Sequence, residues 1–254
     1  MTSPIPPEAT GLWRRREITL PDGRRDTTTQ VFWLQSQRLF ADLRVPIDRP
    51  SVPGAKGFAD YSAEDLLGLA AMQGFAGRFE IEGATCRWLR ALDYQPPGGP
   101  PDEALFRIEG DILVETGIHA AYEEIWQRET PPGAPLAAFR PVEGDGVLVL
   151  AGDHFILVEE RRPTLPEAPS LAALIEADAG TPPAVERLGM LIAYGRIGPG
   201  WRIELASYPW LEGEIWTAGF DEATGLLELS GPAVTQQWRL VESSGALTEI
   251  ISAQ

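Results

Sequence analysis

An internal repeat constrains the fold of this chain more than any other feature. Five features recur in the same order in the two halves, each 108 to 115 positions after its first occurrence. The matched pairs are Phe40 with Phe155, Ser62 with Ser170, Tyr94 with Tyr208, segment 112–117 with segment 226–231, and Trp126 with Trp238. Repetition at a nearly fixed period indicates that each half is one structural unit. We therefore expect two domains, residues 1–132 and 133–254, joined by the proline-rich segment 130–135.

Short apolar segments separated by Gly, Pro and Asp make up most of each half, a pattern typical of β-strands. The clearest expected strands are 30–35, 39–45, 85–94, 112–116, 122–128, 147–150, 155–160, 201–208 and 237–241. Helical periodicity appears twice. One helix begins at Ser62, with Asp65 completing a capping box, and runs through Phe75, whereas the other begins at Ser170 and ends near Gly180.

One helix and about eight short strands in each half suit a closed antiparallel barrel, which leaves no exposed strand edge. The sequence therefore predicts an all-β fold of two tandem lipocalin-like barrels, each with one short helix. A barrel of this size has an interior that is either filled by side chains or holds one small ligand.

The charge balance narrows the possible partners. The chain has 21 basic and 37 acidic residues, a net charge of −16, which disfavours nucleic acids and anionic membranes. The basic clusters 14–16 and 24–25 are expected to be solvated strand or turn edges. Because no apolar run of about 18 residues occurs, membrane insertion is not expected.

Cysteine and lysine usage suggest where the protein works. Cys86 is the single cysteine, so no disulfide can form within the chain, and a reducing compartment is expected. The first residues lack a basic start followed by an apolar core, which favours a cytoplasmic location. Lys56 is the single lysine in a chain rich in Ala, Gly and Pro, a composition typical of a GC-rich bacterium.

Catalytic signatures are missing from the sequence. His119 and His154 are the two histidines, one in each repeat, so a zinc site is not expected, and a haem site would require one of them. GxSxG and HExxH are absent, and Cys86 is expected to be a small buried residue. Residues 195–200 read as a hairpin turn rather than a phosphate loop, because Pro199 has no N–H to donate. No cofactor or metal is predicted.

Alternation along the strands distinguishes the two barrels. In the second repeat, Trp201, Ile203 and Leu205 share one face, which predicts an apolar, filled interior. The first repeat mixes charges with its aromatic faces. Arg90 falls on the face of Trp88 and Tyr94, and Glu124 falls on the face of Tyr122 and Trp126.

A charged group among aromatic side chains needs a partner, because burying it alone is costly. One hypothesis is a cavity in the first barrel lined by Trp88, Tyr94, Tyr122 and Trp126, in which Arg90 and Glu124 orient a small molecule and Arg44 joins at the rim. The alternative is that Arg90 and Glu124 form an ion pair that closes one end of the barrel without a ligand.

Three functional hypotheses follow. The first is non-enzymatic binding of a small molecule in the first barrel. The second is an interaction module without a ligand, in which Trp210 and Trp216 present a patch to a protein partner that the sequence does not identify. The third is an enzyme that uses Glu115 or Glu124 as a general base, which is disfavoured because no nucleophile, metal or cofactor accompanies them.

Three short segments also resemble a known family. They are Glu115-Thr116-Gly117, the stretch from Tyr122 to Trp126, and the hairpin from Gly152 to Ile156. In these segments the chain resembles the tandem lipocalin-like barrels of the fungal Hri-one proteins and their bacterial relatives, a family without an established activity. The resemblance implies the two-barrel fold and supplies no reaction, cofactor or site residue.

Overall fold

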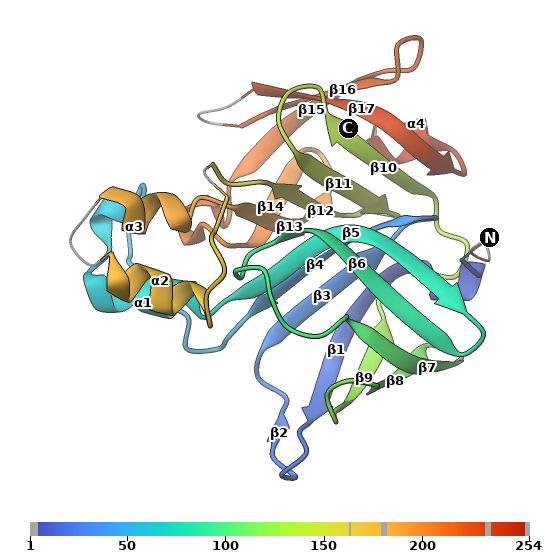
Figure 1. Ribbon diagram of the computed structural model, residues 1–254. Coiled ribbons are helices and arrows are strands. Elements are labelled where there is room, and N and C mark those ends of the chain that lie inside the picture. Colours follow the sequence, from blue (N-terminus) through green and yellow to red (C-terminus); the bar gives the residue numbers. More distant parts are fainter. Residues whose placement is uncertain (1–4, 163, 179–181, 232–234, 252–254) are drawn as a thin grey trace.

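Two antiparallel β-barrels form the molecule, as the repeat predicts (Figure 1). The computed structural model describes residues 5–162, 164–178, 182–231 and 235–251. Barrel one contains β1 (Gly11–Thr19), β3 (Gln30–Gln35), β4 (Leu39–Val45), β5 (Gln73–Glu82), β6 (Thr85–Asp93), β7 (Glu103–Glu109), β8 (Ile112–Gly117) and β9 (Glu123–Arg128). Pairing of β1 with β9 closes this barrel, and the short strand β2 (Arg25–Asp26) extends β1 as a ribbon.

Barrel two repeats this order with eight consecutive strands. They are β10 (Leu136–Pro141), β11 (Gly146–Ala151), β12 (His154–Glu159), β13 (Leu191–Ile197), β14 (Trp201–Ala206), β15 (Ile215–Asp221), β16 (Leu226–Ser230) and β17 (Thr235–Ser244). β10 pairs with β17 to close the barrel. The helix α4 (Leu247–Ile251) adds Ile250 and Ile251 to the core of this barrel.

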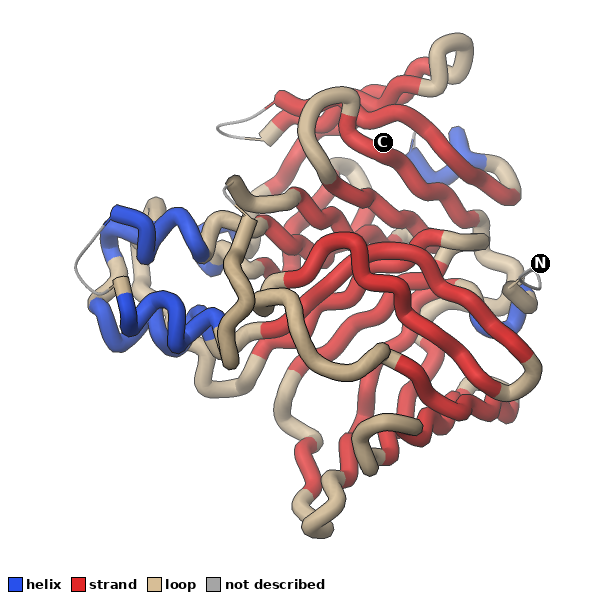
Figure 2. Tube along the Cα trace, viewed as in Figure 1, coloured by secondary structure: helices blue, strands red, loops and turns tan. Residues whose placement is uncertain are grey.

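The helices α1 (Ala63–Ala70), α2 (Leu171–Ala177) and α3 (Pro182–Arg187) lie together at one side of the two barrels, away from α4 (Figure 2). The helix α1 begins at the expected cap, where Ser62 and Asp65 form a capping box. It ends before Phe75, which belongs to β5 and packs inside barrel one, so the expected helix was too long. The helix α2 is capped by Ser170 and is followed by α3, while the expected end at Gly180 lies outside the described residues.

Strand pairing confirms most of the repeat. Phe40 and Phe155 each face a glycine on the next strand, Gly77 and Gly195 respectively. Trp126 and Trp238 pair with Leu113 and Leu227, which are equivalent positions of the expected segments. The match of Tyr94 with Tyr208 is one residue out of register. The residue equivalent to Tyr94 is Ser207. Tyr94 donates its backbone N–H to the Gly74 carbonyl, and Ser207 donates its own to the carbonyl of Ile192, which is the equivalent residue of barrel two.

A β-bulge at the same place in both barrels reverses the alternation of the strand. In barrel one, Ala76 pairs with Leu92 and Gly77 pairs with Arg90, so Ala91 is the extra residue of the bulge and has no partner on β5. Gly77 permits this close approach, because a Cβ there would lie 1.9 Å from the Leu89 carbonyl oxygen. A residue after the bulge therefore points to the opposite face from the one that simple alternation predicts.

The equivalent bulge in barrel two pairs Gly195 with Ile203 and Tyr194 with Leu205. Trp201 and Ile203 pack inside barrel two, as expected, but Leu205 turns outward into the core between the barrels. The prediction that all three share the interior face was therefore wrong for Leu205. The interior of barrel two is nevertheless apolar and filled.

A single hydrophobic core joins the outer faces of the two barrels. Equivalent strands contribute to it from both sides, namely β1 and β3–β6 from barrel one and β10–β14 from barrel two. Phe32 stacks on Tyr194 across this interface with ring centroids 4.1 Å apart. Arg49 of barrel one also pairs with Glu212 of barrel two at 2.7 Å. The two barrels therefore pack as one body rather than as separate units on a flexible link.

None of the helices within the described ranges has the length and apolar character needed to cross a lipid bilayer.

Candidate functional site

Aromatic side chains fill the middle of barrel one. Trp33 lies at the centre and makes edge-on contacts with Phe79, Trp88 and Trp126 at centroid distances of 5.3 to 6.0 Å. Each of these four side chains is buried. Trp126 and Trp88 therefore lie inside the barrel as expected, where they form part of a packed core.

Charged side chains occupy one end of the barrel above this aromatic core. Arg15 pairs with Glu124 at 2.7 Å, and Arg44 lies 3.6 Å from the same carboxylate. Arg44 also pairs with Asp42 at 2.9 Å. Arg44 therefore contacts both acidic side chains. Arg15 belongs to a basic cluster expected to be solvated, but the alternation of β1 turns it inward, where Glu124 and Asp26 neutralise it.

Glu115 completes this polar end. It accepts hydrogen bonds from the Tyr122 hydroxyl at 2.7 Å and from the Trp126 indole N–H at 3.1 Å. Burial, followed by the nearby negative charge of Glu124, raises the pKa of Glu115 to about 8. Glu115 is therefore mostly protonated at neutral pH and adds little charge to the cluster.

The cluster as a whole is close to neutral at pH 7. Two arginines, Arg15 and Arg44, face three carboxylates, Asp26, Asp42 and Glu124, while Glu115 carries a proton. The charges of the arginines and the carboxylates offset one another, so the cluster closes the end of the barrel without a bound ion. In barrel two the positions equivalent to Asp42 and Glu115 are Leu157 and Leu229. The expected chemical asymmetry between the two interiors is therefore present.

The expected pair of Arg90 with Glu124 is not formed. Arg90 pairs with Asp102 at 2.6 Å and with Asp93 at 3.0 Å, and its guanidinium lies 3.6 Å from the centroid of the Phe75 ring. Strands β6 and β7 separate beyond Trp88, and Arg90 lies at this opening near the surface. Asp102, in the loop that leads into β7, is therefore closer to Arg90 than Glu124 is.

Tyr94 also differs from the prediction. The bulge at Ala91 places it on the outer face of barrel one, fully buried in the core between the barrels. Its hydroxyl donates to the Leu69 carbonyl, and its own carbonyl accepts from Arg161 at 2.7 Å. Tyr94 is therefore an interface residue and does not line the interior of barrel one.

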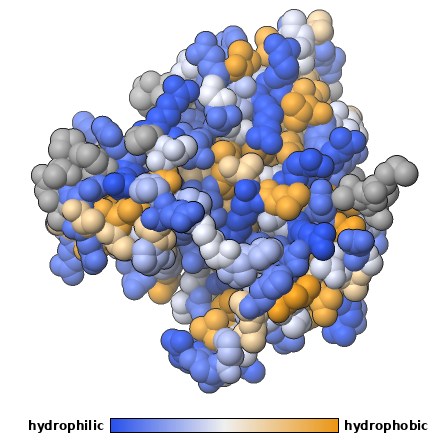
Figure 3. All heavy atoms as spheres, in the orientation of Figure 1, coloured by the Kyte–Doolittle hydropathy of each residue, from blue (hydrophilic) through white to orange (hydrophobic). Residues whose placement is uncertain are grey.

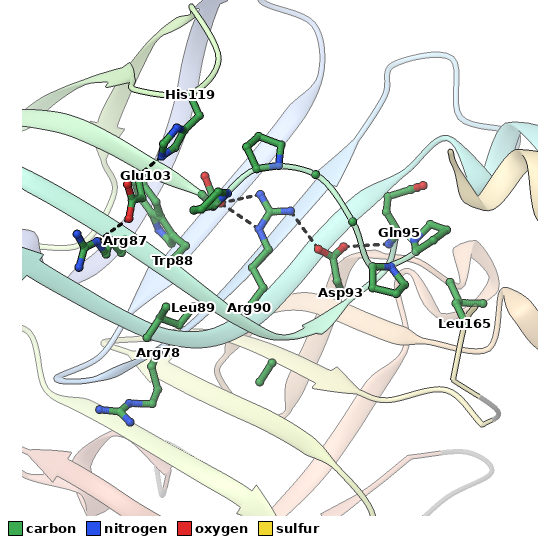
Figure 4. A pocket seen from close by; sticks show the side chains of 18 of the residues that line it. Arg78, Arg87, Trp88, Leu89, Arg90, Asp93, Gln95, Glu103, His119 and Leu165 are labelled. Atoms are coloured by element: carbon green, nitrogen blue, oxygen red, sulfur yellow. Dashed lines mark hydrogen bonds and ion pairs between the residues drawn. The ribbon is translucent and has the colours of Figure 1, made fainter. Parts of the chain in front are cut away.

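A cleft of about 1000 Å³ follows β6 on the outside of barrel one. One wall is β6 with the proline-rich loop 96–101. The other comes from barrel two and consists of Arg140, Glu160, Arg161, Thr164 and Leu165. Figure 4 shows the labelled side chains of β6, from Arg87 to Asp93, in a row that leads to Gln95. Three of the expected site residues, Trp88, Arg90 and Tyr122, line the cleft, and Arg44, Glu124 and Trp126 do not.

Positive charge is concentrated in the cleft. Five of the 21 basic residues of the chain line it, but only four of the 37 acidic ones do. The cationic residues are Arg78, Arg87, Arg90, Arg140 and Arg161, and the acidic ones are Asp93, Asp102, Glu103 and Glu160. The cleft is therefore locally cationic on a strongly acidic protein.

Neither histidine lies inside a barrel. His119 follows β8 in an exposed turn, as expected, and its Nε2 lies 2.9 Å from a Glu103 carboxylate oxygen. His154 faces the interface and contacts the Tyr194 hydroxyl at 3.0 Å, and burial lowers the pKa of its imidazole. The described residues contain no group of three or more His, Cys, Asp or Glu placed to hold a metal ion. Cys86 is buried, and its thiol donates to the Ala104 carbonyl.

The two tryptophans of the interaction hypothesis are largely covered. Trp216 packs inside barrel two. Trp210 is half-buried, with its ring stacked on Tyr208 at 5.0 Å and edge-on to Phe58 at 4.8 Å. On the face drawn in Figure 3, hydrophilic residues dominate and hydrophobic ones form small separate groups. These tryptophans do not form an open patch.

Sequence reasoning missed the residues that barrel two contributes to the cleft. Arg161 follows β12 and Arg140 lies in β10, and nothing in their local sequence indicates that they approach β6. The proline-rich loop 96–101 was a usable signal, because a long irregular loop between strands is often functional.

Comparisons with known proteins support the fold. No protein-family model matches the chain, and no curated protein matches its sequence. The structure is similar to that of the uncharacterised protein YLR301w of Saccharomyces cerevisiae, with a TM-score of 0.58 and 11% identity over 92% of this chain and 98% of that one. A lipocalin-like protein of Bacteroides uniformis matches 48% of this chain and 98% of its own length, with a TM-score of 0.32 and 14% identity.

Proposed function

We propose that the protein is a non-enzymatic binder of a small molecule, and that the ligand occupies the cleft along β6 rather than the interior of barrel one. The observation that carries this proposal is the cleft itself. Its volume of about 1000 Å³ is large enough for a small organic ligand. The interior of barrel one, by contrast, is occupied by aromatic side chains and a self-compensated charge cluster.

The chemistry of the cleft supports binding rather than catalysis. Tyr122 contributes aromatic surface, while Leu89 and the prolines of loop 96–101 contribute aliphatic surface. Arg87 and Arg90 are held by ion pairs to Glu103 and Asp102, so their positions are fixed before a ligand arrives. The carboxylates suggested as general bases, Glu115 and Glu124, are buried in the barrel and paired with other groups.

Finer expectations form part of this proposal. The similarity to the yeast protein over nearly the whole chain supports a relationship to the fungal Hri-one proteins and their bacterial relatives. The single buried cysteine and the single lysine support a cytoplasmic protein of bacterial origin. We also place the boundary between the two repeats at residues 132 and 133, in the segment between β9 and β10.

Steric blocking of the cleft tests the proposal. Leu89 lines the cleft and is 46% exposed, so Leu89→Trp fills the space without disturbing the core. Leu105 is 48% exposed on β7 and does not line the cleft, which makes Leu105→Trp a matched control. The neutral fluorophore N-phenyl-1-naphthylamine serves as the probe, together with native mass spectrometry of protein purified from a bacterial host.

The expected result is saturable binding of the probe to the native protein and to Leu105→Trp, and loss of binding in Leu89→Trp. A ligand carried through purification should likewise be absent from Leu89→Trp. An empty native protein that binds no probe would overturn the proposal and favour the interaction module. Equal binding by both variants would place the probe elsewhere and refute the assignment of this cleft.

A further inference from the structure

Two arginines on the barrel-two wall of the cleft have no carboxylate partner. Within the described residues, neither Arg140 nor Arg161 has a carboxylate oxygen within 4.0 Å of its guanidinium. The arginines of the opposite wall differ, because Arg87 and Arg90 each have an acidic partner at 2.6 Å. The uncompensated positive charge of the cleft therefore lies on the side of barrel two.

Arg161 is the more buried of the two. It is 2% exposed, and its Nη2 donates to the Tyr94 carbonyl at 2.7 Å and to the Asp93 carbonyl at 3.3 Å. Its Nε and Nη1 have no hydrogen-bond partner among the described residues. A guanidinium stays charged in a protein, so Arg161 is a buried cation with donors to spare.

Arg140 lies on the same wall and is half-buried. Its Nη1 donates to the Gly146 carbonyl at 2.9 Å, and among the described residues this is the one hydrogen bond of its guanidinium. Burial lowers the pKa of both guanidinium groups, in keeping with the lack of a carboxylate in ion-pair contact with either. Arginines that are buried or half-buried without a carboxylate partner are suited to bind an anion.

One acidic residue shares this wall. A carboxylate oxygen of Glu160 accepts the backbone N–H of Arg161 at 2.9 Å, and burial raises the pKa of this carboxyl. Asp145 and Glu242 act on Arg140, and Glu160 and Asp93 act on Arg161, all from beyond ion-pair distance. Because none of these carboxylates forms an ion pair with Arg140 or Arg161, an anionic ligand can still pair with both arginines.

We propose that the cleft binds a small organic anion, whose acidic group lies against Arg140 and Arg161 of barrel two while its apolar body lies against Leu89 and the proline-rich loop of barrel one. This inference rests on the proposed function and specifies the chemical class of its ligand. It also assigns barrel two a direct part in binding, since the anion-binding residues come from the second repeat and the apolar wall from the first.

A pair of fluorescent probes with the same ring system tests the inference. The anionic probe is 1-anilinonaphthalene-8-sulfonate, and the neutral probe is N-phenyl-1-naphthylamine. The variants are Arg140→Met and Arg161→Met, which remove the charge but keep an unbranched apolar side chain. Arg202→Met is the matched control, because Arg202 is an exposed arginine of β14 that does not line the cleft.

The expected result is tighter binding of the anionic probe than of the neutral one by the native protein. Each cleft variant should weaken binding of the anionic probe by about tenfold or more, because a hydrogen bond to a charged group is lost. Binding of the neutral probe should stay unchanged, and Arg202→Met should behave as the native protein. Arg161→Lys should recover part of the anionic affinity, which a purely structural role for Arg161 does not predict.

Three outcomes would overturn the inference. Unchanged affinity for the anionic probe in both cleft variants would show that the arginines do not receive it. An equal loss for both probes, in variants whose circular dichroism matches the native protein, would show that the arginines shape the cleft without recognising charge. The third outcome is a native protein that does not bind the anionic probe. If this protein binds the neutral probe and Leu89→Trp abolishes that binding, the proposed function stands and the anion is rejected. If it binds neither probe, the proposed function fails as well. Because Arg161 also anchors two carbonyls, Arg140→Met decides the matter if Arg161→Met does not fold.

Discussion

Replacement of Glu115 by glutamine should change how the stability of the protein depends on pH. Glu115 is buried and has its pKa raised from an ordinary 4.5 to about 8, first by desolvation and then by the charge of Glu124. Glutamine has the same shape and is neutral at every pH. Its carbonyl oxygen can accept from the Trp126 indole, while its N–H donates to the Tyr122 hydroxyl oxygen, so both contacts are kept with the direction of the Tyr122 hydrogen bond reversed.

The sign of the effect follows from proton linkage. Because the folded protein holds the proton of Glu115 more tightly than the unfolded chain does, this proton stabilises the fold fully below pH 4.5. The contribution is lost as pH rises towards 8. The slope for one proton is about 1.4 kcal/mol per pH unit, so the native protein should lose about 3 kcal/mol between pH 5 and pH 7 relative to Glu115→Gln. For a chain of this size that corresponds to roughly 6 to 12 °C in melting temperature.

Urea denaturation followed by tryptophan fluorescence at several pH values between 5 and 8 measures this difference. Other titrating groups, including His154 and Glu159, are common to both proteins and cancel when the two curves are subtracted. Glu123 is the exposed neighbour of Glu124, so Glu123→Gln controls for removal of a charge at this end of the barrel. Parallel curves for the native protein and Glu115→Gln would refute the account of the buried acid.

Three further predictions concern the fold. Gly77→Ala should destabilise the protein by about 3 kcal/mol or more in urea denaturation, because its Cβ would lie 1.9 Å from the Leu89 carbonyl oxygen. The control Gly219→Ala meets no neighbour within 4 Å and should leave the stability unchanged. Equal denaturation midpoints for the two variants would contradict the steric argument. Phe32→Ala should cost about 3 to 5 kcal/mol by the same assay, and a loss below 1 kcal/mol would show that the interface contributes little. Residues 133–254 expressed alone should aggregate in analytical ultracentrifugation because half of the shared core becomes exposed, and a stable monomer would refute the joint packing.

The repeat made the architecture predictable, because equivalent positions reappear in the same order. Phe40 and Phe155 occupy equivalent sites, and the caps Ser62 and Ser170 begin equivalent helices. The bulge was not predictable from alternation, since one extra residue in β6 or β14 leaves no mark on the pattern of apolar residues. That single residue explains why Tyr94 and Leu205 were both assigned to the wrong face.

The chemistry of barrel one was predictable in kind but not in its pairing. Charged residues on an aromatic face indicated a buried polar cluster, and Glu124 does need a cation. Which cation it receives depends on the position of β1 across the closed barrel, where Arg15 faces it. Arg90 lies at the opening between β6 and β7 and receives its partner from a loop. Long-range pairing of this kind depends on barrel closure, which local sequence does not encode.

The joint core between the barrels makes the chain equivalent to a dimer whose subunits can never separate. Equivalent faces of the two repeats meet, as in an isologous dimer, but the segment between β9 and β10 fixes them in one molecule. Association is therefore intramolecular, with an effective local concentration that dilution does not change. A homodimer would lose its partner at low concentration, but this chain should keep the same melting temperature at nanomolar and micromolar concentrations. A covalently joined pair need not have identical halves, and here one barrel has an apolar interior and the other a polar end.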